Sequence, residues 1–373
     1  MRKYYIDHLR TFLILLLFPF HTLRMYTLTE SFYIEGTPHI IPTLFISITS
    51  IWFMNLLFVL AGMSTAYSIQ KRSIKEYCKE RFSKLLMPFI FGVVLTVPIQ
   101  TYYAERFHNG YTGSFIEQYG LFFTKITDLS GYKGGLTPAH LWFLLFLFLI
   151  SILSLPIINF VKKNGRKPLK KGNLWRMIPL FFIIQIFSII EIGERIGQYM
   201  TYFIIGFLVL SREENLEEIQ KNQMPLAIGA ISLLAISSLL DMMGVLGKIN
   251  SIGIFNLLTV AISAVRHAAS WLTILALIGF GRKYLTGTNK IFSYLAKASF
   301  GIYFIHQTVI ITIGYYVLPL VPYRSVQSLV IMILSFIATI AIYVVLKRCP
   351  VLNTLFGMKK SQPVRLEHVV EIG

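Results

Sequence analysis

Long apolar stretches, separated by short and mostly basic segments, constrain this chain more than any other feature. Most of them reach about 20 residues, the length that an α-helix needs to cross the hydrocarbon core of a bilayer. Lipid offers no partners to backbone N–H and C=O groups, so such stretches must be helical inside the membrane. Charged residues make up only 14% of the chain, too few to cover the surface of a water-soluble protein of this length. The sequence therefore predicts an all-α membrane protein.

The apolar stretches predict a bundle of about ten transmembrane helices. They form a single polytopic membrane domain over residues 1–346, and a polar tail follows over residues 347–373. The two shortest stretches, the fifth and the sixth, could be tilted or partly re-entrant. The predicted spans cover residues 8–28, 41–68, 85–104, 140–161, 177–190, 197–211, 224–242, 254–281, 291–319 and 326–346.

The basic residues predict how these helices are oriented. Most of the 35 lysines and arginines lie in alternate connecting segments, on one side of the predicted bundle. The positive-inside rule places that side in the cytoplasm, and an even number of spans then places both termini and the tail there. This distribution accounts for the net charge of +18, so we expect membrane lipids as partners and no nucleic acid. We expect a multi-pass protein of the plasma (inner) membrane.

The longest predicted outer loop covers residues 105–139 and is rich in Gly, Tyr and Phe. It could fold over an outer opening and stack sugars on its aromatic rings, or it could be a flexible connector. The two cysteines, Cys78 and Cys349, have no disulfide, redox or metal spacing. No Walker motif, Gly-rich dinucleotide loop or zinc-type spacing occurs, so we expect neither a metal nor ATP-driven transport.

Two polar side chains inside the first predicted span are candidates for function. Arg10 and His21 are eleven positions apart, roughly three helical turns, so both project from one face of the helix. Pro19 cannot donate a backbone hydrogen bond and should kink the helix beside His21. Ionisable groups are costly in lipid, which favours a functional role. The alternatives are that Arg10 anchors the helix at lipid phosphates and that His21 hydrogen-bonds a neighbouring helix.

Further polar side chains occur in the fourth and ninth predicted spans. His140 and Trp142 begin the fourth span at its outer end, where tryptophan is also a common interfacial anchor. Ser299, Tyr303 and His306 are spaced by four and three positions, so they share one stripe of the ninth span. That stripe is either part of a site or a hydrogen-bonded packing face.

Arg266 lies near the centre of the eighth predicted span and needs a partner there. Asp241 or Glu191 could supply the opposite charge. At the cytoplasmic mouth of the third span, Arg81 and Lys84 lie one turn apart and could bind the phosphates of an anionic ligand. The positive-inside rule explains these two charges equally well.

Four short segments occur along the chain in a distinctive order. They are IDHLRTFLILLLFPFH, which carries Arg10 and His21, FMNLLFVLAGMS at 53–64, ERFSKLLMPF at 80–89 and SFGIYFIH at 299–306. These segments resemble those of the acyltransferase-3 family of integral membrane acyltransferases, and the resemblance extends over roughly residues 4–345. HLWFLL, at 140–145, is similar to the branch that modifies periplasmic glucans with succinyl groups.

The resemblance implies an enzyme that transfers acyl groups other than aminoacyl groups. The donor would be a cytosolic acyl-CoA, such as acetyl-CoA or succinyl-CoA, with no cofactor bound permanently. The acceptor would be a hydroxyl group of a cell-surface glycan or lipid-linked sugar. His21 would serve as catalytic base or transient acyl carrier together with Arg10. The other residues implied are Arg10, Arg81 and Lys84 for the phosphates of acyl-CoA, and His140, Trp142, Ser299, Tyr303 and His306 for the acceptor.

The sequence departs from the family pattern at three positions. Lys84 stands where many members have arginine, which keeps the charge but loses bidentate phosphate recognition. Asn55 stands where relatives often have proline, and Ala61 where many have serine. No fused extracellular hydrolase-like domain follows the last span, so the acyl group would reach the acceptor directly or through a separate extracellular partner protein.

Two other functions remain open from the sequence. A transporter or flippase for a lipid-linked glycan or small anion would share the spans and the buried charges. A scaffold of a glycan-export complex is a further alternative. Consumption of acyl-CoA with release of free CoA would distinguish the acyltransferase from both.

Overall fold

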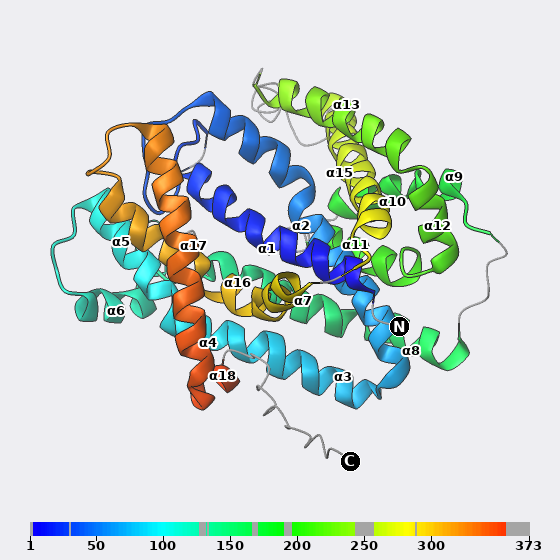
Figure 1. The fold of residues 1–373 in the computed structure, drawn as a ribbon, viewed down its shortest axis with the longest axis horizontal. Helices are drawn as coiled ribbons and strands as arrows, with labels where there is room; N and C mark the ends of the chain where they lie inside the picture. The colour runs from blue at the N-terminus through cyan, green and yellow to red at the C-terminus, as the bar shows by residue number, and fades with distance from the viewer. Residues whose placement is uncertain are drawn as a thin grey trace, which may run out of the picture.

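The structure is a computed structural model that describes residues 3–29, 31–126, 132, 134–165, 171–189, 196–242, 257–287 and 289–355. All regular secondary structure in these ranges is helical, so the prediction of an all-α protein is confirmed (Figure 1). The helices form one bundle around α1, which crosses its centre in Figure 1. Residues 356–373 of the predicted tail lie outside the described ranges.

In the described ranges, seven helices or continuous helical units are long and apolar enough to cross a membrane. They are α1 (Tyr4–Arg24), α2 (Ile40–Ser68) with η1 (Ile69–Lys71), the unit formed by α3 (Ile74–Arg81), η2 (Phe82–Leu86), α4 (Met87–Leu95) and α5 (Val97–Asn109), α13 (Gln223–Met242), α15 (Leu257–Tyr284), α16 (Lys290–Val317) and α17 (Arg324–Arg348).

The other three predicted spans are bent or short. The fourth consists of η3 (Ala139–Leu141), α7 (Trp142–Leu153) and α8 (Leu155–Asn164), with a bend of 48° between its halves. Pro156 lies in the first turn of α8 and cannot donate the hydrogen bond that would continue α7, which explains the break. The fifth and sixth are α9 (Leu174–Met177) with α10 (Leu180–Ile189), and α11 (Ile196–Leu208). The count of ten and the cytoplasmic termini therefore remain predictions.

The predicted outer loop is more ordered than a flexible connector over its described residues. Its first residues belong to α5, and α6 (Phe115–Thr124) begins at a capping box formed by Ser114 and Glu117. Lys125 then pairs with Glu105 at 3.2 Å, and the Gln118 side chain donates to the backbone oxygen of Gly134 at 2.8 Å. The segment thus packs back on itself at one end of the bundle (Figure 1).

Two glycines allow α2 and α11 to pack backbone against backbone. A methyl group on Gly62 would overlap the carbonyl oxygen of Phe203, and one on Gly206 would overlap that of Val59. Small residues permit such close packing in membrane bundles, where lipid provides no hydrophobic drive between helices. This contact fixes α2, whose side chains take part in both sites described below.

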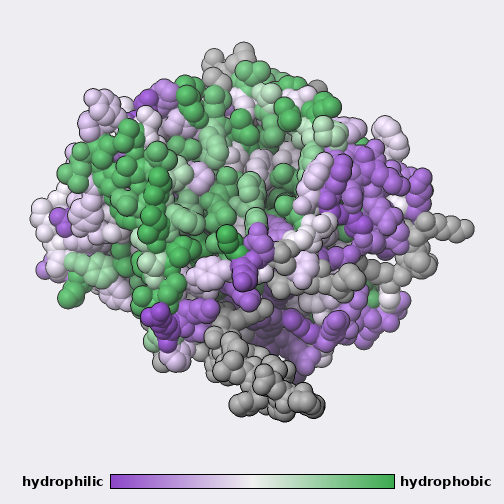
Figure 2. Space-filling view, viewed as in Figure 1, coloured by the Kyte–Doolittle hydropathy of each residue, from purple (hydrophilic) through white to green (hydrophobic). Residues whose placement is uncertain are grey.

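The surface distinguishes lipid-facing helices from water-facing segments. Only 22% of the apolar window of α17 and 28% of that of α13 is buried in the protein, so the rest of their apolar surface is available to lipid. Figure 2 shows hydrophobic side chains over α17 and hydrophilic ones at the right-hand edge, over the helix α12 (Glu213–Lys221). A last short helix, α18 (Pro350–Leu355), follows α17.

Candidate active site

Three histidines from distant parts of the chain meet inside the bundle. His21 lies on α1, His140 in η3 and His306 on α16. The ring centroids of His21 and His306 are 5.1 Å apart, and those of His140 and His306 are also 5.1 Å apart. All three side chains are buried, with His306 wholly inaccessible to solvent. We call this group the histidine trio.

The backbone determines which ring nitrogen of His306 carries the proton. Its Nδ1 lies 2.6 Å from the carbonyl oxygen of Tyr303, and a carbonyl can only accept, so Nδ1 is the donor. In a neutral ring, Nε2 then bears a lone pair, and it has no hydrogen-bond partner among the described residues. His21 Nδ1 is likewise buried without a partner there. Buried ring nitrogens are normally satisfied, so two adjacent exceptions indicate a reactive site.

His140 is held more tightly than the other two histidines. Its Nε2 donates to the carbonyl oxygen of Phe304 at 3.1 Å, and its Nδ1 lies 3.3 Å from the amide nitrogen of Gln100. The Tyr303 hydroxyl donates to the His140 carbonyl oxygen at 2.6 Å. The residue before it, Ala139, has a φ of 46°, a region that costs a non-glycine residue about 1–3 kcal/mol. Backbone strain of this kind persists only where the surrounding structure imposes it, and in this protein it occurs beside a residue of the candidate site.

Aromatic rings cover the trio. Phe32, from the segment between α1 and α2, stacks on His21 at 6.0 Å with an interplanar angle of 18°. Tyr132, from the predicted outer loop, packs on Phe32 at 6.3 Å and on Tyr33 at 5.0 Å. His108, on α5, is 2.7 Å from the carbonyl oxygen of Phe32 through its Nε2. Two residues of the predicted outer loop, His108 and Tyr132, thus contact the ring that stacks on His21.

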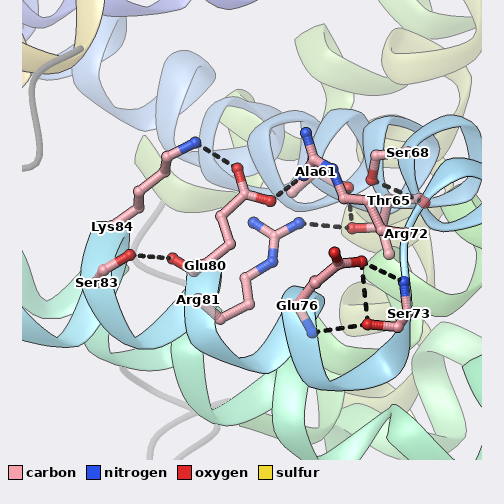
Figure 3. A network of polar contacts seen from close by, with 10 residues as sticks. All are labelled: Ala61, Thr65, Ser68, Arg72, Ser73, Glu76, Glu80, Arg81, Ser83 and Lys84. Atoms are coloured by element: carbon pink, nitrogen blue, oxygen red, sulfur yellow. Dashed lines mark hydrogen bonds and ion pairs between the residues drawn. The ribbon is translucent and has the colours of Figure 1, made fainter. Parts of the chain in front are cut away.

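The predicted basic residues Arg10 and Arg81 lie near the C-terminal end of α2. Arg10 donates to the Ser64 hydroxyl at 2.8 Å and lies 3.4 Å from Asp7. Arg81 donates to the adjacent Thr65 at 3.1 Å, and Figure 3 shows its guanidinium group directed at that hydroxyl. Two guanidinium groups from different helices therefore reach neighbouring positions of α2.

Arg81 and Lys84 have different surroundings. The Arg81 guanidinium lies 4.7 Å above the Tyr77 ring, and its buried Nε has no hydrogen-bond partner in the described ranges. Lys84 instead forms an ion pair with Glu80, which also pairs with Arg72 (Figure 3). The ammonium group of Lys84 is thus already paired with a carboxylate of the protein, which it shares with Arg72.

Two predicted residues lie away from the trio. The Ser299 hydroxyl is 3.3 Å from that of Thr11 on α1, beside Arg10, and it donates to its own helix at the Leu295 carbonyl. The Trp142 ring packs on Tyr199 at 5.5 Å. Of the three residues in the predicted stripe on α16, His306 belongs to the trio and Tyr303 contacts it, whereas Ser299 does not.

Comparison with known proteins identifies the family. Residues 3–348 match a family model described as an acyltransferase domain, that of acyltransferase-3. The chain belongs to the acyltransferase-3 family. This acyltransferase is also similar to proteins named glucans biosynthesis protein C from Salmonella paratyphi B, Salmonella agona and Salmonella dublin, each 23% identical over 399 residues, with 100% of this chain and 98% of the relative covered. No solved structure matches the chain.

Family membership decides between the functions that the sequence left open. The chain is a multi-pass membrane acyltransferase, since members of the family are integral membrane enzymes and the model matches almost the whole chain. The transporter or flippase alternative and the scaffold alternative find no such support. Among the described residues of this acyltransferase, no three His, Cys, Asp or Glu side chains form a group that could hold a metal ion.

Two buried glutamines that no motif of the sequence indicates form hydrogen bonds beside the trio. Gln100 on α5 is fully buried, and its amide nitrogen donates to Thr308 at 2.8 Å besides contacting His140. Gln307 on α16 donates to the Gln100 side-chain oxygen at 2.9 Å. The sequence feature that could have indicated these residues is a side-chain amide within an apolar span, because a buried amide needs several hydrogen-bond partners. This network connects α5, η3 and α16 around His306.

Proposed function

We propose that this acyltransferase moves an acyl group from acyl-CoA to a hydroxyl of a cell-surface glycan or lipid-linked sugar. The observation that carries the proposal is a pair of ring nitrogens, His21 Nδ1 and His306 Nε2, that have no hydrogen-bond partner among the described residues. The centroids of the two rings are 5.1 Å apart. An imidazole with a free lone pair is the usual base for a hydroxyl, since its ordinary pKa lies near neutrality.

In this proposal His306 orients His21. A proton on His21 Nδ1 is shared with His306 Nε2, which leaves the other nitrogen of His21 with its lone pair. Catalytic hydrogen bonds often shorten only when the substrate is bound. The arrangement resembles the way a carboxylate holds a catalytic histidine in hydrolases. Tyr303 fixes His306 through its carbonyl oxygen, at 2.6 Å.

The transfer step balances without an added reagent. His21 takes the proton of the acceptor hydroxyl, and the oxygen attacks the carbonyl carbon of the thioester. The bond from that carbon to sulfur breaks, and the CoA thiolate leaves with the proton from the His21 ring. The products are an acyl ester of the acceptor and free CoA.

The donor binds with its phosphates at Arg10 and Arg81. Along α1, Arg10 and His21 are separated by about 16 Å at about 1.5 Å per residue. The pantetheine arm, long and thin, spans this distance while the nucleotide stays at the basic end of the bundle. We propose that this end faces the cytoplasm and the histidine trio faces outward.

Acyl transfer in sealed proteoliposomes tests the proposal. Labelled acetyl-CoA or succinyl-CoA is supplied on one side, and free CoA and acylated acceptor are measured. His21→Ala should abolish transfer, while the matched control His39→Asn, which keeps a side chain able to cap α2, should not. Arg10→Ala should weaken use of the donor more than use of the acceptor. Near-normal transfer by His21→Ala at normal expression would reject the assignment.

A further inference from the structure

A second polar cavity lies in the bundle, apart from the histidine trio. It has a volume of about 220 Å³, is partly open, and is lined by residues of α2, α10, α11 and α15. Amide, hydroxyl and cationic side chains make most of its wall, among them Asn55, Gln198, Ser263 and Arg266. Polar groups inside a membrane bundle are costly, and they commonly line a pathway or a binding site.

The cavity lies toward the same end of the bundle as the trio. Asn55 precedes Thr65 by ten positions on α2, so it is about 15 Å further along that helix than the contact with Arg81. Gln198 lies in the first turn of α11. The cavity is therefore on the side away from the basic group, which is the side proposed to face the acceptor.

The charge in the cavity wall is internally balanced. Arg266 pairs with Asp241 at 2.5 Å, the first of the two partners that the sequence suggested, and Glu191 lies outside the described residues. Asp241 also accepts a hydrogen bond from Ser47 at 2.7 Å. A balanced pair offers hydrogen bonds without a net charge, which favours a neutral polar ligand over a free anion.

An ordered amide network fixes the polar wall. Gln198 donates to the side-chain oxygen of Asn55 at 3.2 Å, and Asn55 donates to Ser270 at 2.9 Å. Tyr202 donates to the same serine at 3.0 Å. Amides both donate and accept, as the hydroxyl groups of a sugar do. Tyr199 completes the wall with an aromatic ring, which suits the apolar face of a sugar.

Aromatic rings separate this cavity from the trio. Tyr199 stacks on Phe58 at 4.5 Å, Phe58 meets Phe143 at 5.0 Å, and Phe143 meets Tyr303 at 6.0 Å. A group held in the cavity is therefore not the group that reacts at His21. The cavity is therefore a place for a unit of the acceptor other than the one that reacts.

The structure assigns to this cavity a remote carbohydrate subsite, which binds one neutral sugar unit of an oligosaccharide acceptor through Asn55, Gln198 and Ser263. The choice of acceptor rests on the proposed function, whereas binding itself is measured without any acyl donor. Longer acceptors should then bind more tightly than a single sugar, because only they can contact the protein beyond the cavity while one unit occupies it.

Binding of linear gluco-oligosaccharides and of glucose to the full-length protein in nanodiscs tests this assignment. Tryptophan fluorescence is a suitable readout, since the Trp142 ring lies 5.5 Å from Tyr199. We expect Gln198→Leu to weaken oligosaccharide binding about tenfold, as expected for the loss of one or two hydrogen bonds. Ser263→Ala, a milder change, should weaken it in the same direction. Thr201→Val is the matched control, because Thr201 is on α11, bonds its own helix and does not line the cavity.

Two outcomes would overturn the subsite. One is wild-type affinity in both Gln198→Leu and Ser263→Ala, and the other is no saturable binding of any oligosaccharide to the wild-type protein. Release of CoA from acyl-CoA, measured in the same variants, keeps the two proposals separate. In the wild-type protein, CoA release without any oligosaccharide binding rejects the subsite alone, and oligosaccharide binding without CoA release rejects the proposed function alone.

Discussion

The hydroxyl group of Tyr303 donates a hydrogen bond to the backbone carbonyl oxygen of His140, at 2.6 Å, across 163 positions of the chain. The carbonyl oxygen of the same tyrosine accepts the proton of His306 Nδ1. One residue of α16 therefore positions two members of the trio, one through its side chain and the other through its backbone.

The first prediction concerns this side-chain bond. Tyr303→Phe leaves the buried His140 carbonyl without its donor, which should lower the free energy of unfolding by about 1–3 kcal/mol. Displacement of His140 should also lower kcat by about 10–100-fold, while the KM for acyl-CoA changes little. Thermal unfolding and steady-state rates measure the two effects. Tyr294→Phe, on the exposed part of the same helix, should leave the unfolding free energy and kcat unchanged. A loss of rate in this control as well would mean that any change in α16 lowers activity, which would contradict a specific role of Tyr303.

The second prediction concerns the cooperation of His21 and His306. If His306 acts by orienting His21, His306→Ala should reduce kcat by about 100-fold or more. The double variant with His21→Ala should then be no slower than His21→Ala alone, because residues that act as a unit are not additive. Rates of CoA release for the four proteins give this comparison. Losses that multiply would indicate that the two rings act separately.

The third prediction separates Arg81 from Lys84. Arg81→Ala removes a cation whose Nε has no partner in the part of the chain that the structure describes, and it should raise the KM for acyl-CoA about tenfold or more. Lys84→Ala should have a smaller effect, because the Lys84 ammonium group is already paired with Glu80. An acyl-pantetheine donor, which lacks the nucleotide phosphates, should be used equally by the wild type and Arg81→Ala. An equal defect with both donors would contradict a phosphate role.

The fourth prediction concerns the close contact of α2 and α11. Gly62→Ala places a methyl group against the backbone of Phe203 and should cost about 1–3 kcal/mol as the two helices move apart. Thermal unfolding in one detergent measures the loss. Gly120→Ala is the control, since its added methyl group meets no atom within 4 Å and alanine favours the helical state. Equal stability of the two variants would rule out a tight contact.

The fifth prediction concerns pH and the ion pairs of Glu213 at the start of α12. Partial burial raises the pKa of the Glu213 carboxyl, but hydrogen bonds from Arg282 and Lys3 outweigh it, so the pKa lies below its ordinary value. A lowered pKa in the folded state contributes stability above the unfolded pKa of about 4.3, and that stability is lost as the pH falls through the folded value. Glu213→Gln should therefore flatten the dependence of unfolding temperature on pH below about 5. Because Glu213 is about half exposed, added salt should reduce the difference.

Several features could be predicted from the sequence because they depend on local composition. The long helices follow from apolar runs, since lipid requires every backbone hydrogen bond to be made within the segment. The candidates His21, His140 and His306 were found because imidazoles are conspicuous in such runs. The pairing of Arg266 with Asp241 was one of two options that charge alone allowed. The resemblance to the family rested on short motifs that the family model matches.

Other features required the tertiary structure. The sequence around Gln100 does not indicate that its side chain contacts His140. Nor does the local sequence indicate that the Phe32 ring stacks on His21. The ion pair between Glu80 and Lys84 likewise became evident only in the structure. Helical spacing placed Ser299 on the stripe of His306, yet its hydroxyl lies beside Thr11 near the other end of α1. Helical spacing predicts which side chains share one face of a helix, but it does not predict which neighbouring helix that face contacts.

The sequence by itself thus determined that this chain is a helical membrane protein and which ionisable side chains its spans carry. Only the tertiary structure decided which of them meet, which nitrogen of His306 bears the proton, and where a second polar cavity lies. The physical reason is that hydropathy and helix formation depend on neighbours along the chain. A site made by residues 21, 140 and 306, in contrast, depends on how helices far apart in sequence pack together.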